Sequence, residues 1–280
     1  MFRFRRSAPP PAPAIPLNSL GMSIPSACTL QLNFANERTL DTERPAIMIE
    51  LTNATKTYDA GRRTVNAVRG VSLAIESGEF VSIMGPSGSG KSTLMHLLGA
   101  LDTPSTGAAR FAGRDLAAMS DRERSLLRRT RIGFVFQAFN LLPTLTAAEN
   151  VALPLLLDGT NRREAMLRAN ANLEKVGLSH RGDHFPEELS GGEMQRVAVA
   201  RALISDPEAV LCDEPTGNLD SAASTEILKL LAALPEKGKR CVVMVTHDLN
   251  AAKYGTRLVK IRDGLLESDE AVPAMAGAGI

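Results

Sequence analysis

The sequence has few cysteines and almost no excess of charge of either sign. Its three cysteines, Cys28, Cys212 and Cys241, are widely spaced and form no CxxC pair. This spacing supports neither a disulfide framework nor a zinc site, and it fits a reducing cytoplasm. The formal net charge is only +1. The composition therefore implies no nucleic-acid partner.

Long apolar runs are also missing. No stretch approaches the roughly 18 consecutive apolar residues that a membrane-spanning helix needs, because Gly, Pro or charged residues interrupt each run. We therefore expect any membrane association to depend on a partner. The N-terminus carries Arg3, Arg5 and Arg6, but residues 8–16 are rich in Pro and cannot form the apolar helix of a signal peptide. We expect the protein not to be translocated.

The two ends of the chain differ in composition from its middle. Residues 1–45 lack hydrophobic periodicity and are rich in Pro, Ser, Thr and Asn, which predicts a disordered extension. Residues 268–280 are mostly small and predict a flexible tail. Met22 and Met48 are alternative starts, so we hypothesise that translation begins after residue 1, which the intact mass of the native protein would test. The ordered domain is expected to span residues 46–267.

The ordered part predicts an α/β fold. Apolar residues alternate over 47–51 and over 71–75, with Gly61 between, as in an antiparallel pair with one buried face. Short apolar runs typical of strands covered on both faces indicate a mostly parallel central sheet. These runs are Phe80 to Met84, Ile132 to Phe136, Ala209 to Cys212 and Cys241 to Val245.

Helical spacing falls between the second and third of these runs. It covers residues 147–157 and 162–176, and Gly177 stops the second helix. We therefore expect a helical insert over about 138–206. Asp263-Gly264 marks a late turn.

A phosphate-binding motif follows the first apolar run. Gly85-Pro-Ser-Gly-Ser-Gly-Lys91-Ser92 matches GxxxxGK[ST] and precedes a predicted helix over 92–98. Its glycines allow backbone N–H groups to surround phosphates, Lys91 reaches the β and γ phosphates, and the Ser92 hydroxyl ligates Mg²⁺. A merely flexible Gly/Ser loop is the alternative, and the flanking strand and helix speak against it. The predicted nucleotide contacts are Gly85, Pro86, Ser87, Gly88, Ser89, Gly90, Lys91, Ser92 and Thr93.

Two carboxylates end the third apolar run. Asp213 and Glu214 fall at the carboxyl edge of the predicted sheet, where ligands of α/β folds bind. Asp213 suits the role of holding Mg²⁺, and Glu214 suits the role of polarising the attacking water. An isolated Asp-Glu pair would be read as a solvated strand end. The presence of the GxxxxGK[ST] motif in the same chain favours the catalytic interpretation.

A third motif is the run Leu189-Ser-Gly-Gly-Glu193, which continues Met-Gln-Arg-Val-Ala-Val-Ala-Arg-Ala-Leu203. It resembles the signature motif of the ATP-binding-cassette (ABC) ATPase family. Ser190, Gly191 and Gly192 start a predicted helix whose N–H groups and dipole favour an anion. The resemblance implies that this anion is the γ-phosphate bound on an opposite subunit, with Glu193 in the same site. Capping of the helix by Ser190 and Glu193 is compatible with that role.

The resemblance extends over about residues 47–266 and assigns four further site residues. It implies that Gln137 contacts Mg²⁺ and water, that Asp220 organises the subunit interface, and that His247 contacts the γ-phosphate. It also implies that Tyr58 stacks on adenine. Taken alone, Gln137 would be a surface residue, Asp220 part of a turn, His247 structural and Tyr58 a core or surface aromatic.

The family resemblance implies both an architecture and a mode of action. The expected fold is the P-loop NTPase core of ABC ATPases with an antiparallel β-subdomain and an inserted α-helical subdomain. ATP and Mg²⁺ are the expected cofactors, and two ATP molecules would be sandwiched in a head-to-tail homodimer. An integral-membrane permease would dock near Phe139 to Asn150 and hold the ATPase on the inner face of the membrane.

Three runs are similar to the lipoprotein-release and macrolide-export group, which also contains a cell-division ATPase. They are Leu97-Leu-Gly-Ala-Leu-Asp-Thr-Pro104, Phe136-Gln-Ala-Phe-Asn-Leu-Leu-Pro143 and Asp213-Glu-Pro-Thr-Gly-Asn-Leu-Asp220. We therefore expect an ATPase subunit that powers a permease for lipoprotein release or efflux. The alternative is an ATP-dependent regulatory switch on a membrane partner, without transport. A role in DNA repair or translation is disfavoured because the single cassette has no long coiled-coil insertion.

Overall fold

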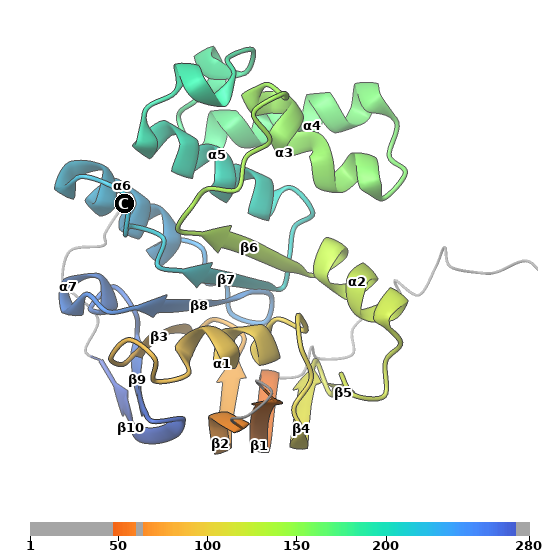
Figure 1. Cartoon of the computed structure of the whole chain (residues 1–280). Coiled ribbons are helices and arrows are strands. Elements are labelled where there is room, and N and C mark those ends of the chain that lie inside the picture. The colour runs from red at the N-terminus through yellow and green to blue at the C-terminus, as the bar shows by residue number, and fades with distance from the viewer. Residues whose placement is uncertain (1–46, 60–63, 273–280) are drawn as a thin grey trace, which may run out of the picture. The chain divides into compact units, whose positions relative to one another are not determined.

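A computed structural model describes residues 47–59 and 64–272 (Figure 1). Contacts divide the chain into the units Met1–Asp41 and Thr42–Ile280, and all described residues belong to the second. The expected disordered extension, Cys28 and the end of the expected tail lie outside the described residues.

A four-stranded antiparallel sheet begins the described chain. Its strand order is β2-β1-β4-β5. Ile49 pairs with Ile75 and Leu51 with Leu73, and all four side chains are buried, which confirms the antiparallel pair expected from the alternating pattern. The strands are β1 (Ile47–Asp59), β2 (Thr64–Glu76), β4 (Thr106–Phe111) and β5 (Arg114–Asp115).

The second sheet has six strands in the order β10-β9-β3-β8-β7-β6. Neighbouring strands from β9 to β6 are parallel, and every residue of β3 and β8 is buried, which confirms the central sheet expected from the continuous apolar runs. The strands are β3 (Phe80–Met84), β6 (Ile132–Phe136), β7 (Ala209–Asp213), β8 (Cys241–Thr246), β9 (Arg257–Arg262) and β10 (Leu265–Ala271).

The late turn at Asp263-Gly264 joins β9 to the antiparallel β10, as the sequence predicts. However, β10 runs to Ala271, so its residues 268–271 are a strand where the tail was expected to begin. Small and acidic side chains hid this strand from the sequence pattern, because β10 is an edge strand with mostly exposed side chains whose backbone pairs with β9.

One helix lies between the two sheets, and three form a separate layer. Helix α1 contacts β1, β2 and β4 of the first sheet and β7 and β8 of the second. Helices α3, α4 and α5 gather beyond the β6 edge of the second sheet (Figure 1). The helices are α1 (Lys91–Leu98), α2 (Asp121–Thr130), α3 (Ala147–Leu157), α4 (Arg162–Lys175), α5 (Gly191–Leu203), α6 (Ser221–Ala232) and α7 (Leu249–Ala252).

The helical layer has an apolar core of its own. Val151 of α3, Leu173 of α4 and Val197 of α5 belong to one buried cluster, separate from the cluster between the sheets. Short 3₁₀ turns at Ser179–Arg181 and Pro186–Glu188 connect α4 to α5. The layer is also packed on the second sheet, because Val199 and Ala202 of α5 are buried in one cluster with Val135 of β6 and Val210 of β7.

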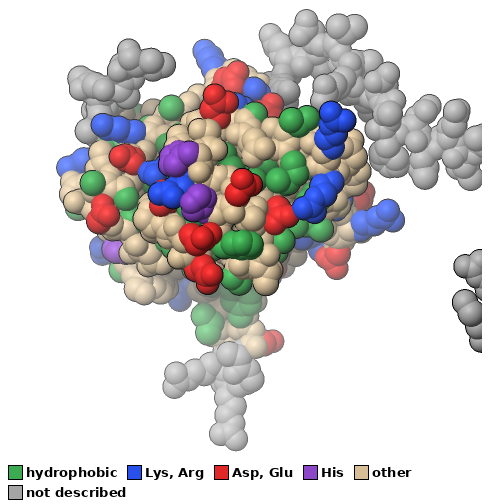
Figure 2. Space-filling view, turned by 90° about the horizontal axis from the view of Figure 1, so that it is seen from above, with side chains coloured by type: hydrophobic (Ala, Val, Ile, Leu, Met, Phe, Trp, Pro, Cys, Tyr) green, Lys and Arg blue, Asp and Glu red, His purple; other side chains and the backbone are tan. Residues whose placement is uncertain are grey.

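The outer face of the helical layer carries basic, acidic, histidine and apolar side chains mixed together (Figure 2). No helix within residues 47–59 and 64–272 is both long enough and apolar enough to cross a membrane.

Candidate functional site

The GxxxxGK[ST] loop borders a cavity of about 880 Å³ at the start of α1. Loop and helix residues Ser87, Gly88, Gly90, Lys91, Ser92 and Thr93 line it. Glu214, which follows β7, and His247, which follows β8, line the same cavity. Parallel strands bring these groups together because the carboxyl ends of β3, β7 and β8 meet at one edge of the sheet.

Neighbouring backbone presses closely on this loop, which explains two of its glycines. A Cβ at Gly85 would lie 2.1 Å from the carbonyl oxygen of Ile261, and one at Gly90 would lie 2.2 Å from that of Ala67. Gly90 also has φ +98°, a left-handed conformation that other residues rarely adopt. The loop is thus fixed between β2 and β9, so its backbone groups face the cavity in one arrangement.

Helix α1 begins without a side-chain cap. Its N-cap is Gly90, and its first turn has no acidic residue. Side chains accept hydrogen bonds from the first turn of every other described α-helix, for example Ser120 at α2 and Thr146 at α3. The free N–H groups of α1 and its positive dipole end therefore face the cavity, an arrangement that attracts an anion such as a phosphate.

Lys91 brings a positive charge to the same place. Its side chain is largely buried, and its ammonium donates to the carbonyl oxygens of Gly85 and Pro86, both at 2.8 Å. No carboxylate pairs with Lys91 among the ion pairs of the described residues. The nearby Ser89 hydroxyl is buried without a hydrogen-bond partner. The Ser89 hydroxyl and the third N–H of the Lys91 ammonium therefore remain available to a bound phosphate.

Asp213 ends β7 beside α1. Burial and the charge of Glu214 raise the pKa of its carboxyl, and the charges of His96 and Lys91 on α1 oppose this shift. The ionised form of Asp213 is thus poorly stabilised by the protein alone, and a cation at this position would stabilise it.

Glu214 and His247 form a pair across the cavity edge. The Glu214 Oε1 lies 3.0 Å from the His247 Nδ1, and the Glu214 N–H donates to the Val245 carbonyl at 2.9 Å. Glu214 has φ +46°, which is uncommon for a residue with a side chain and typical of functional positions. The His247 side chain is 67% exposed and that of Glu214 is 24% exposed, so both are accessible to a ligand.

Gln137 and Asp220 do not line the cavity. The Gln137 Nε2 donates to the Asn218 Oδ1 at 3.2 Å, and the Asn218 Nδ2 donates to the Gln137 carbonyl at 3.0 Å. Asp220 accepts a bond from the Ala223 N–H and so caps α6. The structure therefore ties Gln137 to the segment 217–220, a contact that sequence reasoning did not foresee.

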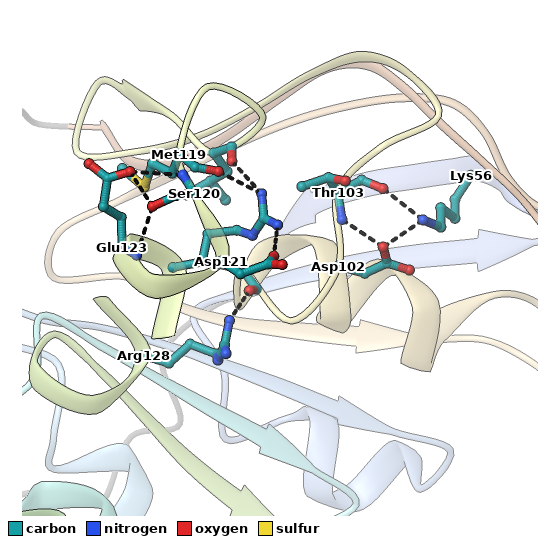
Figure 3. A network of polar contacts seen from close by, with 11 residues as sticks. Lys56, Asp102, Thr103, Met119, Ser120, Asp121, Glu123 and Arg128 are labelled. Carbon is teal, nitrogen blue, oxygen red and sulfur yellow. Dashed lines mark hydrogen bonds and ion pairs between the residues drawn. The ribbon is translucent and has the colours of Figure 1, made fainter. Parts of the chain in front are cut away.

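Tyr58 lies outside the residues that line the cavity, and its side chain interacts with charged neighbours. Its hydroxyl donates to the Asp102 Oδ2 at 3.0 Å, and the Lys56 ammonium lies 5.2 Å from the ring centroid. Lys56 also bonds Asp102 and the Thr103 carbonyl, which ties β1 to the segment after α1 (Figure 3). Burial and the bond to Asp102 raise the pKa of Tyr58. Tyr58 as a residue is 37% exposed, which leaves area for stacking.

The signature residues lie at the start of α5, apart from the cavity. The Ser190 hydroxyl accepts from the Glu193 N–H, and the Glu193 carboxylate accepts from the Ser190 N–H at 2.8 Å. Arg181 donates to the same carboxylate at 3.0 Å. A Cβ at Gly192 would lie 2.9 Å from the Ala223 Cβ of α6, so helix packing explains one of the two glycines. None of these residues lines the cavity at α1.

Sequence reasoning missed Gln195 of α5. This side chain is fully buried, and its Nε2 donates to the carbonyl of Pro215, directly after Glu214, at 2.7 Å. Its Oε1 has no hydrogen-bond partner among the described residues. Gln195 therefore connects the signature helix to the loop that carries Glu214. Helical spacing alone gave no signal for it, because a polar residue at this point of a helix would be expected to face water.

Comparisons with known proteins identify the family. The ABC transporter family matches residues 68–217, more than half of the chain. An uncharacterized ABC transporter ATP-binding protein of Thermotoga maritima is 51% identical over 223 residues, which cover 80% of this chain and 95% of that protein. The macrolide export ATP-binding/permease protein MacB of Chlorobaculum tepidum is 49% identical, but the match covers only 34% of its length and 79% of this chain.

A solved structure agrees with these sequences. The ATP-binding cassette MJ0796, in a dimeric post-hydrolysis state bound to ADP and Pi, superposes with a TM-score of 0.74 at 44% identity. The match covers 81% of this chain and all of the other. The expected α/β fold of ABC ATPases is thereby confirmed. The chain belongs to the ABC transporter family, as an ATP-binding, ATP-hydrolysing cassette.

Proposed function

We propose that this cassette powers a separate membrane permease of the macrolide-export and lipoprotein-release group. The observation that carries the proposal is the uncapped start of α1, which opens into a cavity shared by Lys91, Glu214 and His247. The MacB relatives join an ATP-binding part to a permease in one protein, and this chain spans about a third of their length. A separate permease would supply the remainder, with this chain on its cytoplasmic side.

The residues at the cavity support hydrolysis of ATP. The free N–H groups of α1 and the Lys91 ammonium bind the phosphates, and these fixed donors stabilise charge that develops during transfer. Glu214 orients a water molecule against the γ-phosphate, and the His247 Nδ1, 3.0 Å from the Glu214 Oε1, positions that carboxylate. Tyr58 provides a ring for adenine outside the phosphate cavity.

The same site fits Mg²⁺. Within residues 47–59 and 64–272 no three His, Cys, Asp or Glu side chains cluster as a metal cage, which agrees with the habit of Mg²⁺ to rely on few protein ligands plus phosphates and water. Ser92 and Asp213 would hold the ion, and Asp213 lacks enough compensation from the protein for its ionised form. Gln137 would join them through its Oε1, which is not used in the bond from its Nε2 to Asn218. When bound, Mg²⁺ neutralises charge on the phosphates.

A second copy of the chain would complete each site. Ser190, Gly191, Gly192 and Glu193 lie at the start of α5 and do not line the cavity of their own chain. A head-to-tail homodimer would bring these residues to the γ-phosphate of the opposite chain, with Asp220 at the interface. Closure of the dimer would then be coupled to hydrolysis, and reopening to product release.

A groove beside the helical layer offers a place for the permease. Its volume is about 470 Å³, and its walls include Phe134, Leu153 and Leu157 together with Asn140, within the expected docking segment 139–150. Three arginines also line it: Arg128, Arg129 and Arg201. An amphipathic segment of a permease, with apolar side chains and a carboxylate, would suit these walls.

The test is ATP-dependent recovery of a membrane partner. Glu214→Gln protein would be purified with Mg²⁺ and ATP from detergent-solubilised native membranes, and the bound proteins identified by mass spectrometry. The matched control is the Glu214→Gln, Lys91→Ala double variant, which should not hold ATP. One dominant multi-span protein that is enriched over this control would support the proposal. Recovery of soluble proteins alone would favour the regulatory switch and overturn the transport role.

A further inference from the structure

Two consecutive residues after Gln137 adopt the left-handed conformation. Phe139 has φ +58° and Asn140 has φ +51°. Asn tolerates this conformation, whereas a bulky residue such as Phe is found there only when its surroundings enforce it. Some contact must therefore hold the Phe139–Asn140 turn.

Arg201 of α5 supplies that contact. Its Nη2 donates to the Phe139 carbonyl at 2.8 Å, and its Nη1 donates to the Asn140 carbonyl at 2.5 Å. Burial lowers the pKa of the Arg201 guanidinium, and no carboxylate pairs with it among the ion pairs of the described residues. Backbone carbonyls stabilise this half-buried cation, so the turn and Arg201 depend on each other.

The Phe139 side chain reaches the other end of the same helix. Its Cζ lies 3.9 Å from the position that a Cβ on Gly191 would occupy. Leu219 Cδ2 lies 3.5 Å and the Asn218 carbonyl oxygen 3.8 Å from the same position. Phe139 is therefore held by its backbone to the last turn of α5, and its ring contacts the surroundings of the first residue of α5.

The turn also borders the groove proposed for the permease. Asn140 and Arg201 both line it, and Phe136, the last residue of β6, lies on the same wall. A partner seated in the groove would touch the guanidinium and the turn directly. Gly191 itself does not line the groove. Within the turn, Phe139 is the residue whose side chain approaches Gly191.

We propose that Arg201 and Phe139 are positioning residues for the signature motif: Arg201 fixes the Phe139–Asn140 turn, and the Phe139 ring then sets Gly191 for contact with the ATP of the opposite chain. The inference rests on the proposed homodimer.

The experiment separates dimer closure from nucleotide binding. In the full chain carrying Glu214→Gln, sedimentation velocity with Mg²⁺ and ATP measures dimerisation, and a fluorescent ATP analogue measures binding to the monomer. Arg201→Met and Phe139→Ala should each weaken dimerisation about tenfold, and the double variant little more, because the two residues act as one unit. Monomer affinity for the analogue should stay within about twofold, since neither residue lines the cavity at α1.

Arg168→Met is the matched control, because Arg168 also donates to a backbone carbonyl, that of Ile204 after α5, but does not line this groove. It should leave dimerisation unchanged. Thermal unfolding would show whether each variant folds. If Arg201→Met does not fold, the measurement on Phe139→Ala tests the inference. A folded variant whose dimerisation constant stays within about threefold of its parent's would overturn the inference. A variant whose affinity for the analogue falls as much as its dimerisation would also overturn it. A parent that does not dimerise with ATP would instead contradict the proposed homodimer.

Discussion

The starts of α1 and α5 were both predicted to bind phosphate, yet they are built differently. Helix α1 begins at Gly90 without a side-chain cap, beside the buried charge of Lys91 and a cavity. Helix α5 begins at Ser190 with a complete capping box to Glu193. One helix start leaves its donors free for a ligand, and the other already satisfies part of its first turn.

The N-termini of α1 and α5 therefore suit different roles in nucleotide binding. Free N–H groups with a buried ammonium bind an anion without a second chain. A capped start keeps the helix stable and leaves the N–H groups of Gly191 and Gly192 for the nucleotide that we propose a second chain brings. The comparison predicts that changes at α1 abolish chemistry, whereas changes at α5 affect folding or dimer closure.

The largest effect is expected from Glu214→Gln, because Glu214 lines the α1 cavity and is the carboxylate that we propose orients water. Turnover should fall by about 10²–10⁴-fold, the usual contribution of a general base, while nucleotide binding persists. Phosphate release and analogue binding would measure the two quantities, with Glu270→Gln on the exposed β10 as the control. Turnover at the parent rate would remove Glu214 from this role.

Lys91→Ala tests the charge at the start of α1. Loss of one fixed donor to developing charge should lower turnover by about 10²–10³-fold and weaken nucleotide binding as well. Lys253→Ala is the control, since the exposed Lys253 ammonium bonds no described side chain except that of Asn250. Parent-like nucleotide affinity in folded Lys91→Ala protein would break the contrast between the two helix starts.

Matched glycine changes compare the packing of the two ends. Gly90→Ala places a Cβ against the Ala67 carbonyl in a left-handed conformation, so the free energy of unfolding should fall by about 1–3 kcal/mol. Gly191→Ala meets only ordinary contacts at 3.5 Å or more and should change stability by less than about 1 kcal/mol. Urea unfolding measures both. Equal losses would mean that the signature start is as tightly packed as the P-loop.

The α5 cap should have a smaller effect on stability than the change at Gly90. Ser190→Ala should cost about 1 kcal/mol of stability at neutral pH, a typical value for a lost N-cap. Bonds from Ser190 and Arg181 lower the pKa of Glu193. A carboxylate with a lowered pKa stabilises the fold above its unfolded pKa of about 4.3, and this contribution disappears as pH falls through the folded pKa. The stability gap between parent and Glu193→Gln should therefore shrink toward pH 3, and a constant gap would contradict the capping role.

The sequence correctly predicted the strands and helices that depend on local patterns. The P-loop follows β3 and opens α1, and the buried strand runs over 80–84, 132–136 and 209–212 lie within the observed strands. The helices over 147–157 and from 162 also agree with their patterns. The edge strand β10 was missed because its identity depends on pairing with β9 and not on an apolar pattern.

The placement of individual site residues depended on contacts between distant segments. Gln137 packs against Asn218, and Gln195 and Arg201 bond the carbonyls of Pro215, Phe139 and Asn140. Each contact joins residues about 20 to 81 positions apart. Sequence spacing on one helix carries no information about such partners, since the fold decides which segments meet.

By itself, the sequence determined that the protein is an ABC ATPase. The GxxxxGK[ST] loop, the Asp213-Glu214 pair and the signature run are contiguous motifs whose backbone geometry is local. Only the tertiary structure decided which of these groups share a cavity. Lys91, Glu214 and His247 meet because parallel strands end at one edge, whereas Ser190 and Gly191 begin a helix that packs in a separate layer. That separation is physical in origin: the helical layer buries its own apolar core, so the start of α5 lies outside the cavity at α1.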